Sequence, residues 1–225
     1  MLTEILRTGA ARGGIEVRQN VTLIFNYLFF PSIALIVMYF LRGVSIDGGG
    51  SVALYAIPGI LAMNVLFTGL MGLATTLMME REDGTLLRAR SVPNGIRTYL
   101  VGKLLGQVAF TVSSLIVVIV LAAVLFDGFL GEAGPRVLHL IWLLPLGMLA
   151  TLPFGAVLGS VLPSPRHLSF VSLGLMGLVA ISGVFYPMDG QPMMAHVIGQ
   201  CFPLSWMGMG MRSALLAPEA GDTVG

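Results

Sequence analysis

Five long apolar stretches, separated by short polar segments, dominate the pattern of hydrophobic and polar positions along this chain. A helix needs about 20 mainly apolar residues to cross the hydrocarbon core of a bilayer. The pattern therefore predicts five membrane-spanning helices near residues 21–41, 52–79, 100–126, 137–162 and 168–186. The second stretch would reach about 42 Å as one helix, so we expect it to tilt, to kink near Pro58 and Gly59, or to protrude into the cytoplasm.

The region after the fifth stretch, residues 187–217, is also apolar but is broken into shorter pieces. Pro187, Pro192 and Pro203 divide it, and apolar runs of about 10–14 residues are more typical of re-entrant or interfacial segments than of spans. We therefore predict a pair of short helices that dip into the membrane from the outer side. The alternative is a single irregular helix over residues 193–217 that crosses back.

Composition places this pattern in lipid rather than in water. Hydrophobic residues make up 56% of the sequence and charged residues 10%, whereas a soluble domain typically carries about 25% charged residues. The chain is therefore predicted to be an all-α integral membrane protein, with one transmembrane domain over residues 1–225. A net charge of +1 offers no broad basic surface for nucleic acid. The single cysteine, Cys201, has no second cysteine for a disulfide or a metal site.

Lysine and arginine are distributed unevenly between the polar segments. If the N-terminus faces the cytoplasm, nine of the twelve basic residues lie on the inner side, and Arg42, Arg136 and Arg212 lie outside. Acidic residues divide into five inside and six outside, so the asymmetry is specific to positive charge. By the positive-inside rule, we predict a multi-pass protein of the plasma membrane with a cytoplasmic N-terminus and a cytoplasmic loop at residues 80–98.

Residues 1–20 form a cytoplasmic segment before the first predicted span. Leu2, Ile5 and Leu6 stand among polar residues, which favours a short helix lying along the inner leaflet. The alternative is a frayed tail, which three glycines in the segment favour: Gly9, Gly13 and Gly14.

The most charged stretch, MMEREDGTLLRARSVPNG at residues 78–95, lies between the second and third predicted spans. It mixes both signs, which suits contact with a soluble protein, because lipid-binding patches are clusters of basic residues alone. Gly84 and the Pro93-Asn94-Gly95 turn predict a short surface helix between them. The alternative is an ordinary solvated loop whose arginines fix the topology.

Two motifs in these regions resemble a known family. The loop reads Glu-Arg-x-x-Gly-Thr-Leu-Leu-Arg at 80–88, followed by Pro-Asn-Gly and by Tyr-Leu-x-Gly-Lys at 99–103. The stretch 182–216 supplies a second set of positions: Gly183, Tyr186, Pro187, Pro203, Trp206 and Arg212. Together they resemble the ABC-2-type transporter permeases, most closely the drug-export subgroup typified by daunorubicin-resistance permeases. The second motif corresponds there to an outer re-entrant helix pair.

The resemblance implies a type V exporter-like transmembrane domain that pairs with a second copy of itself and with two copies of an ABC ATPase. ATP and Mg would bind to that ATPase, and no cofactor to this chain. The loop would carry a coupling helix, held to its own membrane domain by Leu86 and Leu87. Its candidate coupling residues are Glu80, Arg81, Glu82, Asp83, Gly84, Thr85, Leu86, Leu87 and Arg88. Such permeases usually have six spans, so we expect a sixth span that the sequence does not contain and interpret the sequence as incomplete. The alternative is that the last helix is missing by nature.

Four polar residues within the predicted spans are candidates for a translocation path: Asn26, Asn64, Gln107 and Ser113. Polar side chains in a bilayer tend to face other helices, so the alternative is that they only bond helix to helix. Lys103 is expected to extend to the inner membrane surface. The methionines, among them Met63, Met71 and Met176, either form an adaptable binding surface or fill gaps between helices.

Motifs of enzymatic chemistry are missing from the sequence. It has no Gly-x-x-x-x-Gly-Lys-Ser/Thr phosphate loop, so the chain is not itself the ATPase, and it has no metal-site or hydrolase motif. We therefore expect a non-enzymatic permease subunit of an ATP-driven exporter for a hydrophobic or amphipathic compound, such as a drug, an antibiotic or a lipid-like metabolite. Two alternatives stay open: export of a lipid-linked polysaccharide, and a membrane scaffold without transport.

Overall fold

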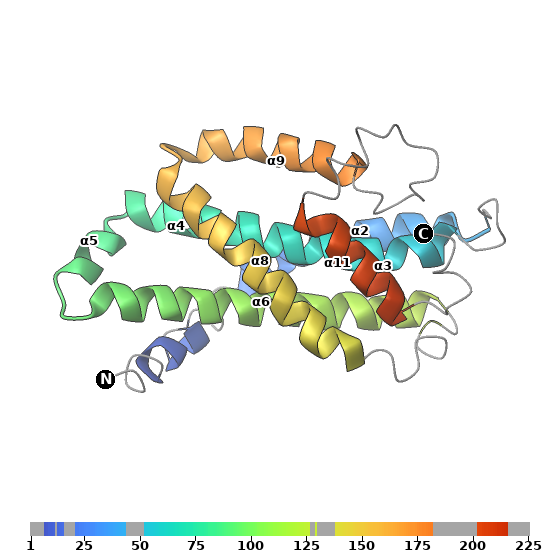
Figure 1. Cartoon of the computed structure of the whole chain (residues 1–225), viewed down its shortest axis with the longest axis horizontal. Helices are drawn as coiled ribbons and strands as arrows, with labels where there is room; N and C mark the ends of the chain where they lie inside the picture. The colour runs from blue at the N-terminus through green and yellow to red at the C-terminus, as the bar shows by residue number, and fades with distance from the viewer. Residues whose placement is uncertain are drawn as a thin grey trace.

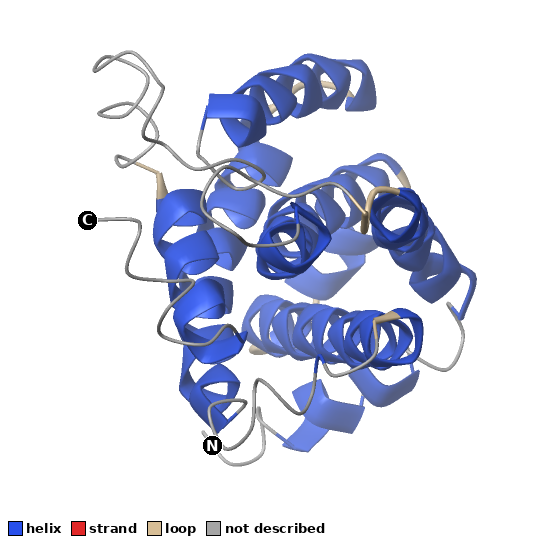
Figure 2. Cartoon of the chain, turned by 90° about the vertical axis from the view of Figure 1, so that its right-hand side faces the viewer, coloured by secondary structure: helices blue, strands red, loops and turns tan. Residues whose placement is uncertain are grey.

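The described part of the chain is built from helices alone (Figures 1 and 2). The computed structural model describes residues 7–11, 13–15, 21–43, 52–126, 129, 138–181 and 202–215. Its elements are α2 (Val21–Phe40), α3 (Val52–Leu66), the π-helix η1 (Phe67–Gly72), α4 (Leu73–Glu82), α5 (Thr85–Arg90), α6 (Gly95–Leu125), α8 (Leu140–Val161), α9 (Pro165–Ile181) and α11 (Pro203–Leu215). The predicted all-α class is confirmed for these residues.

Three helices within the described ranges are long and apolar enough to cross a bilayer: Tyr55–Glu82, Gly95–Leu125 and Leu140–Val161. They lie where the second, third and fourth spans are predicted. The shorter α2 and α9 occupy the first and fifth predicted positions, so the count of five spans stays a prediction. The helix of the second stretch continues into the charged segment as far as Glu82, and α6 begins at Gly95, ahead of the predicted start at residue 100.

A π-helical segment interrupts the longest apolar helix, a feature that the sequence reasoning missed. Pro58 lies inside α3, near the predicted kink, but the change in helix type comes later, at η1. A π-helix widens the turn and is frequently found at functional sites. Here the Gln107 Nε2 donates a hydrogen bond to the Thr68 carbonyl at 2.7 Å, so a side chain of α6 contacts the backbone of η1.

The packing of α8 against this helix depends on two glycines four residues apart. A Cβ atom at Gly155 would lie 2.5 Å from the Leu70 carbonyl oxygen, and one at Gly159 would lie 2.8 Å from the Ala74 carbonyl oxygen. Since both neighbours are backbone atoms, only glycine allows α8 this close to η1 and α4. Small residues at this spacing thus set the distance between the helices.

The N-terminal helical residues pack against the beginning of α6 (Figure 1). Gly9 and Gly13 are buried, and a Cβ at Gly13 would lie 2.9 Å from the Gly102 carbonyl oxygen and 3.1 Å from the Gly106 nitrogen. Two of the three glycines that favoured a frayed tail, Gly9 and Gly13, therefore permit close helix contact instead, whereas Gly14 is exposed. The position of this helix along the inner leaflet stays a prediction.

The charged segment lies at one end of the bundle, and α11 runs from the middle of the bundle into its other half (Figure 1). The short helix α11 packs across α3 and α8 and begins at Pro203 after a bend at Phe202. Residues 187–201 lie outside the described residues, so the re-entrant pair and the single irregular helix both stay predictions. The 13 residues of α11 extend only about 20 Å. The motif residues Gly183, Tyr186 and Pro187 lie outside the described residues.

Candidate functional site: a charged corner and an apolar cavity

A sharp corner joins the two longest helices at one end of the molecule (Figure 1). The chain turns at Asp83 and Gly84, forms α5, and turns again at Pro93 and Asn94 before α6 begins. Gly84 has φ +71° and Asn94 has φ +57°. Glycine adopts this left-handed conformation readily, and asparagine tolerates it better than most residues. The predicted short surface helix is thus present, with the breakers where the sequence placed them.

Only some of the predicted coupling residues are exposed on the surface of the chain and available to a partner. Glu82, Asp83 and Arg88 are exposed, and Gly84 and Thr85 are half-buried. Leu86 packs against the main hydrophobic cluster, as expected. The expectation for Leu87 is wrong, because its side chain is 68% exposed. Adjacent residues on a helix point about 100° apart, so a helix lying on the bundle surface buries Leu86 and turns Leu87 outward.

Glu80 is turned inward to α6 rather than outward. Its carboxylate accepts hydrogen bonds from the Tyr99 hydroxyl and from the Lys103 ammonium. Lys103 is 6% exposed and Glu80 is 23% exposed on their side chains. The expectation that Lys103 extends to the inner surface is therefore wrong, since the Glu80 charge holds it within the helix interface.

Arg81 is turned toward the end of α8. Its guanidinium donates hydrogen bonds to three backbone carbonyls, those of Ser160 at 2.9 Å, Leu162 at 2.6 Å and Pro163 at 3.2 Å. The last carbonyls of a helix have no partner within the helix, and a cation there is favourable. Arg81 thus caps α8 from the corner.

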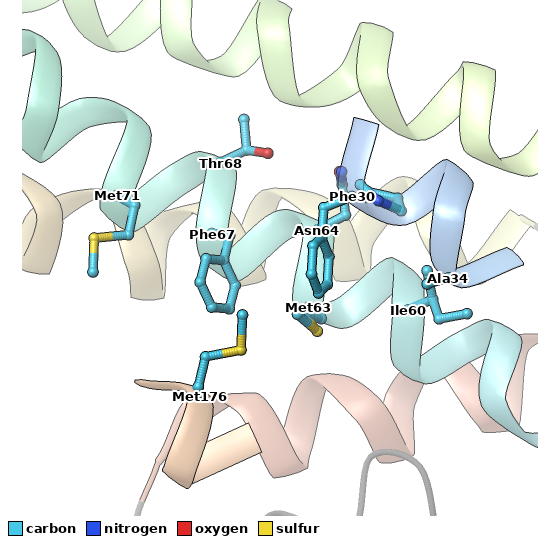
Figure 3. Close-up of a pocket in the computed structure, with 10 residues that line it drawn as sticks. Phe30, Ala34, Ile60, Met63, Asn64, Phe67, Thr68, Met71 and Met176 are labelled. Carbon is cyan, nitrogen blue, oxygen red and sulfur yellow. The ribbon is translucent and has the colours of Figure 1, made fainter. Parts of the chain in front are cut away.

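An apolar cavity of about 220 Å³ lies between α2, the α3–η1 helix and α9 (Figure 3). Figure 3 shows Phe67 and Met176 directed toward each other across it, with Met63 to one side. The full lining comprises Phe30, Pro31, Ala34, Ile60, Met63, Asn64, Phe67, Thr68, Met71 and Met176. The cavity is therefore made of aliphatic, aromatic and thioether groups with few polar atoms.

Of the predicted path residues with described side chains, Asn64 alone lines this cavity. It exchanges hydrogen bonds with Ser114 of α6, at 3.0 Å from its Nδ2 and 3.3 Å to its Oδ1. Gln107 is buried against η1, as described above, and Ser113 is half-buried on α6. Asn26 lies in α2, and its side chain is outside the described residues.

Comparison with known proteins decides the family. The sequence profile of the ABC-2 type transporter family matches residues 10–216. The chain belongs to the ABC-2 type transporter family. No curated protein and no solved structure matches it significantly.

Membership gives this ABC-2 chain its general role. It is a membrane-embedded transport permease subunit and not itself catalytic, and permeases of the family normally work with an ABC ATPase. Within the described residues, no group of three or more His, Cys, Asp or Glu side chains is placed to hold a metal ion.

Several residues of this ABC-2 permease escaped the sequence reasoning because they are brought together only in space. Phe30 and Ala34 come from α2, and Tyr99 meets Glu80 across the corner. The methionines gave a partial signal, since Met63, Met71 and Met176 all line the cavity. Nothing in the local pattern around Arg81 indicated the end of α8 as its partner.

Replacing Ser114 with alanine is expected to destabilise the ABC-2 permease by about 0.6–1.7 kcal/mol, because both contacts with Asn64 are lost. Ser113→Ala is the matched control on the next position, where the side chain is only half-buried. Thermal unfolding of both variants in detergent checks this expectation. An equal shift for the two variants would contradict it.

Proposed function

We propose that this chain is the permease subunit of an ATP-driven exporter for a hydrophobic or amphipathic compound, within the drug-export subgroup. The proposal rests on one observation. The continuous helix Val52–Glu82 lines the apolar cavity in its middle and ends in the charged corner. A displacement of the corner therefore acts on the same helix that contacts the cargo.

The corner is proposed to be the contact for two ABC ATPase subunits, one on each copy of a homodimer. Glu82, Asp83, Thr85 and Arg88 carry this contact, since Glu80 and Arg81 are engaged within the chain. ATP and Mg bind to the ATPase. The corner and the N-terminus face the cytoplasm of a plasma-membrane protein, in agreement with the distribution of lysine and arginine.

The cavity is proposed to receive the cargo. Its few polar atoms suit a compound that is mainly apolar, since polar groups without partners are costly to bury. Methionine side chains adapt to differently shaped ligands. A polysaccharide chain would need a long polar groove with stacking surfaces, whereas this cavity of about 220 Å³ has two aromatic residues, Phe30 and Phe67.

Reversing both corner acids, in Glu82→Arg/Asp83→Arg, tests the proposed function. We expect co-purification of the ATPase to fall by at least about tenfold, equivalent to about 1.4 kcal/mol, because the charges would then repel their partner surface. The measurements are recovery of the ATPase on the tagged permease and stimulation of ATP hydrolysis.

Arg42→Glu provides the matched control, because it reverses an exposed charge far from the corner. Arg42 lies over the ring of Tyr39, which contacts Phe126 at the other end of α6. It is expected to leave ATPase recovery unchanged. Normal assembly and normal stimulation in the double variant would exclude the corner as the contact. A wild-type chain that recruits no ATPase and gives no response to nucleotide would favour the scaffold.

A further inference from the structure

Two neighbouring charges at the end of α4 bind two different helices. Glu80 accepts from Tyr99 and Lys103 of α6, whereas Arg81 donates to the end of α8. Adjacent positions on a helix point about 100° apart, so the pair holds the end of α4 between both partners. The sequence analysis assigned these two charged residues to an external partner, whereas in the structure they bind other helices of the same chain.

The Arg81 contact has a geometry that only arginine supplies. Helix α8 ends at Val161, and the three acceptors are the carbonyls of Ser160, Leu162 and Pro163. One planar guanidinium reaches all three with fixed donors, whereas a lysine ammonium is a compact charge on a flexible stem. The contact therefore depends on the shape of the guanidinium as well as on its charge, and it fixes the position of the turn after α8.

The turn that Arg81 contacts leads directly into α9, which forms part of the cavity wall. Helix α9 begins at Pro165, two residues after the last acceptor, and carries Met176 on the cavity. Leu168 in its first turns packs against Ala74 and Met78 of α4. The opposite wall, with Met71, belongs to the helix that bears Arg81. Arg81 thus connects the helix that forms one side of the cavity to the turn that leads into α9 on the other side. The connection lies at the end of the bundle where the corner is.

We propose that Arg81 is a positioning residue that transmits displacement of the corner to the α8–α9 turn, so that α9 moves with α4 and changes access to the cavity. Glu80 holds α6 to the same point. This inference rests on the proposed function, because an ATPase must displace the corner. It assigns Arg81 to transmission inside the permease and leaves recruitment of the ATPase to the exposed residues.

Hydrogen exchange of the isolated permease tests the contact between Arg81 and the α8–α9 turn, without any ATPase. In Arg81→Lys, we expect the backbone amides of Ser164 and of residues 166–168 to exchange roughly tenfold faster, because hydrogen bonds to a charged donor are lost. Arg97→Lys, at an exposed position of α6, is the control and should leave that rate unchanged. Unchanged exchange in Arg81→Lys would overturn the proposal.

The complex with its ATPase tests transmission. Labelling of Met176 by a small aryl diazirine is compared between the nucleotide-free and the vanadate-trapped complex. In the wild type, we expect labelling to differ between these two states. Arg81→Lys and Arg81→Gln should recruit the ATPase and hydrolyse ATP, yet lose most of that difference, whereas Arg88→Gln should lose recruitment.

The outcomes separate the two ideas. If the wild-type chain recruits no ATPase, the proposed function fails. The transmission role of Arg81 then fails with it, even if hydrogen exchange confirms the contact between Arg81 and the α8–α9 turn. If recruitment is normal and Arg81→Lys keeps the full difference at Met176, only the inference fails. Should Arg81→Gln not fold, Arg81→Lys decides, because it keeps the positive charge beside the helix end.

Discussion

Gly155→Val is expected to prevent stable folding of the permease. The added Cβ would lie 2.5 Å from the Leu70 carbonyl oxygen and 3.0 Å from the Gly69 carbonyl oxygen. These atoms belong to the backbone of η1, so they cannot rotate away as a side chain would. Overpacking of a core typically costs about 1–3 kcal/mol and occasionally more, and a clash with two backbone atoms belongs to the upper end.

The loss of stability should increase with the size of the side chain at position 155 and should be confined to the interface between α8 and η1. We expect Gly155→Ala to fold with a clearly lower unfolding temperature, and Gly155→Val to give little monodisperse protein in detergent. Gly174→Val is the matched control, because a Cβ at Gly174 meets no atom within 4 Å. Size-exclusion chromatography and thermal unfolding of the three variants supply the measurement. Wild-type behaviour of Gly155→Val would mean that α8 does not approach η1 this closely.

Ala34→Trp is expected to close the cavity. Ala34 lies on α2 at the cavity wall (Figure 3), and an indole ring there would take up much of a space of about 220 Å³. We expect labelling of Met71 by a small aryl diazirine to fall by at least about tenfold, the effect of 1.4 kcal/mol in binding. Export of a hydrophobic dye from cells should fall with it.

Ile33→Trp separates filling of the cavity from a general effect of tryptophan on α2. Ile33 precedes Ala34, and 44% of it is exposed on the outer face of the helix. An added ring there faces surrounding lipid in the proposed topology and should leave labelling of Met71 unchanged. If Ala34→Trp and Ile33→Trp behaved alike, the cavity would have no part in cargo binding.

The family assignment came from residues that act locally. Gly84 and Pro93-Asn94-Gly95 bound a short helix because their backbone preferences are properties of those residues alone, and the structure places α5 between them. The all-helical class follows from long apolar stretches, since backbone groups in lipid must be bonded within the segment. Such signals can be read without any knowledge of what packs against what.

The roles of individual charges were less predictable. Glu80 and Arg81 look like a solvated pair beside Glu82 and Asp83 in the sequence. Their partners, Lys103 and the carbonyls at the end of α8, lie 23 and about 80 positions away in contacts that no helical periodicity encodes. The error for Leu87 has a different cause, because the face that α5 buries depends on how it lies on the bundle.

The sequence by itself determined the helical class, the membrane setting, the ABC-2 family and the place of the corner. Each follows from local composition, backbone preference or a short motif. Only the tertiary structure decided that Gly155 sets the distance between α8 and η1, that Arg81 caps α8, and that Asn64 faces a cavity with Met176. These depend on distances between helices far apart in the chain, which packing fixes and local sequence does not.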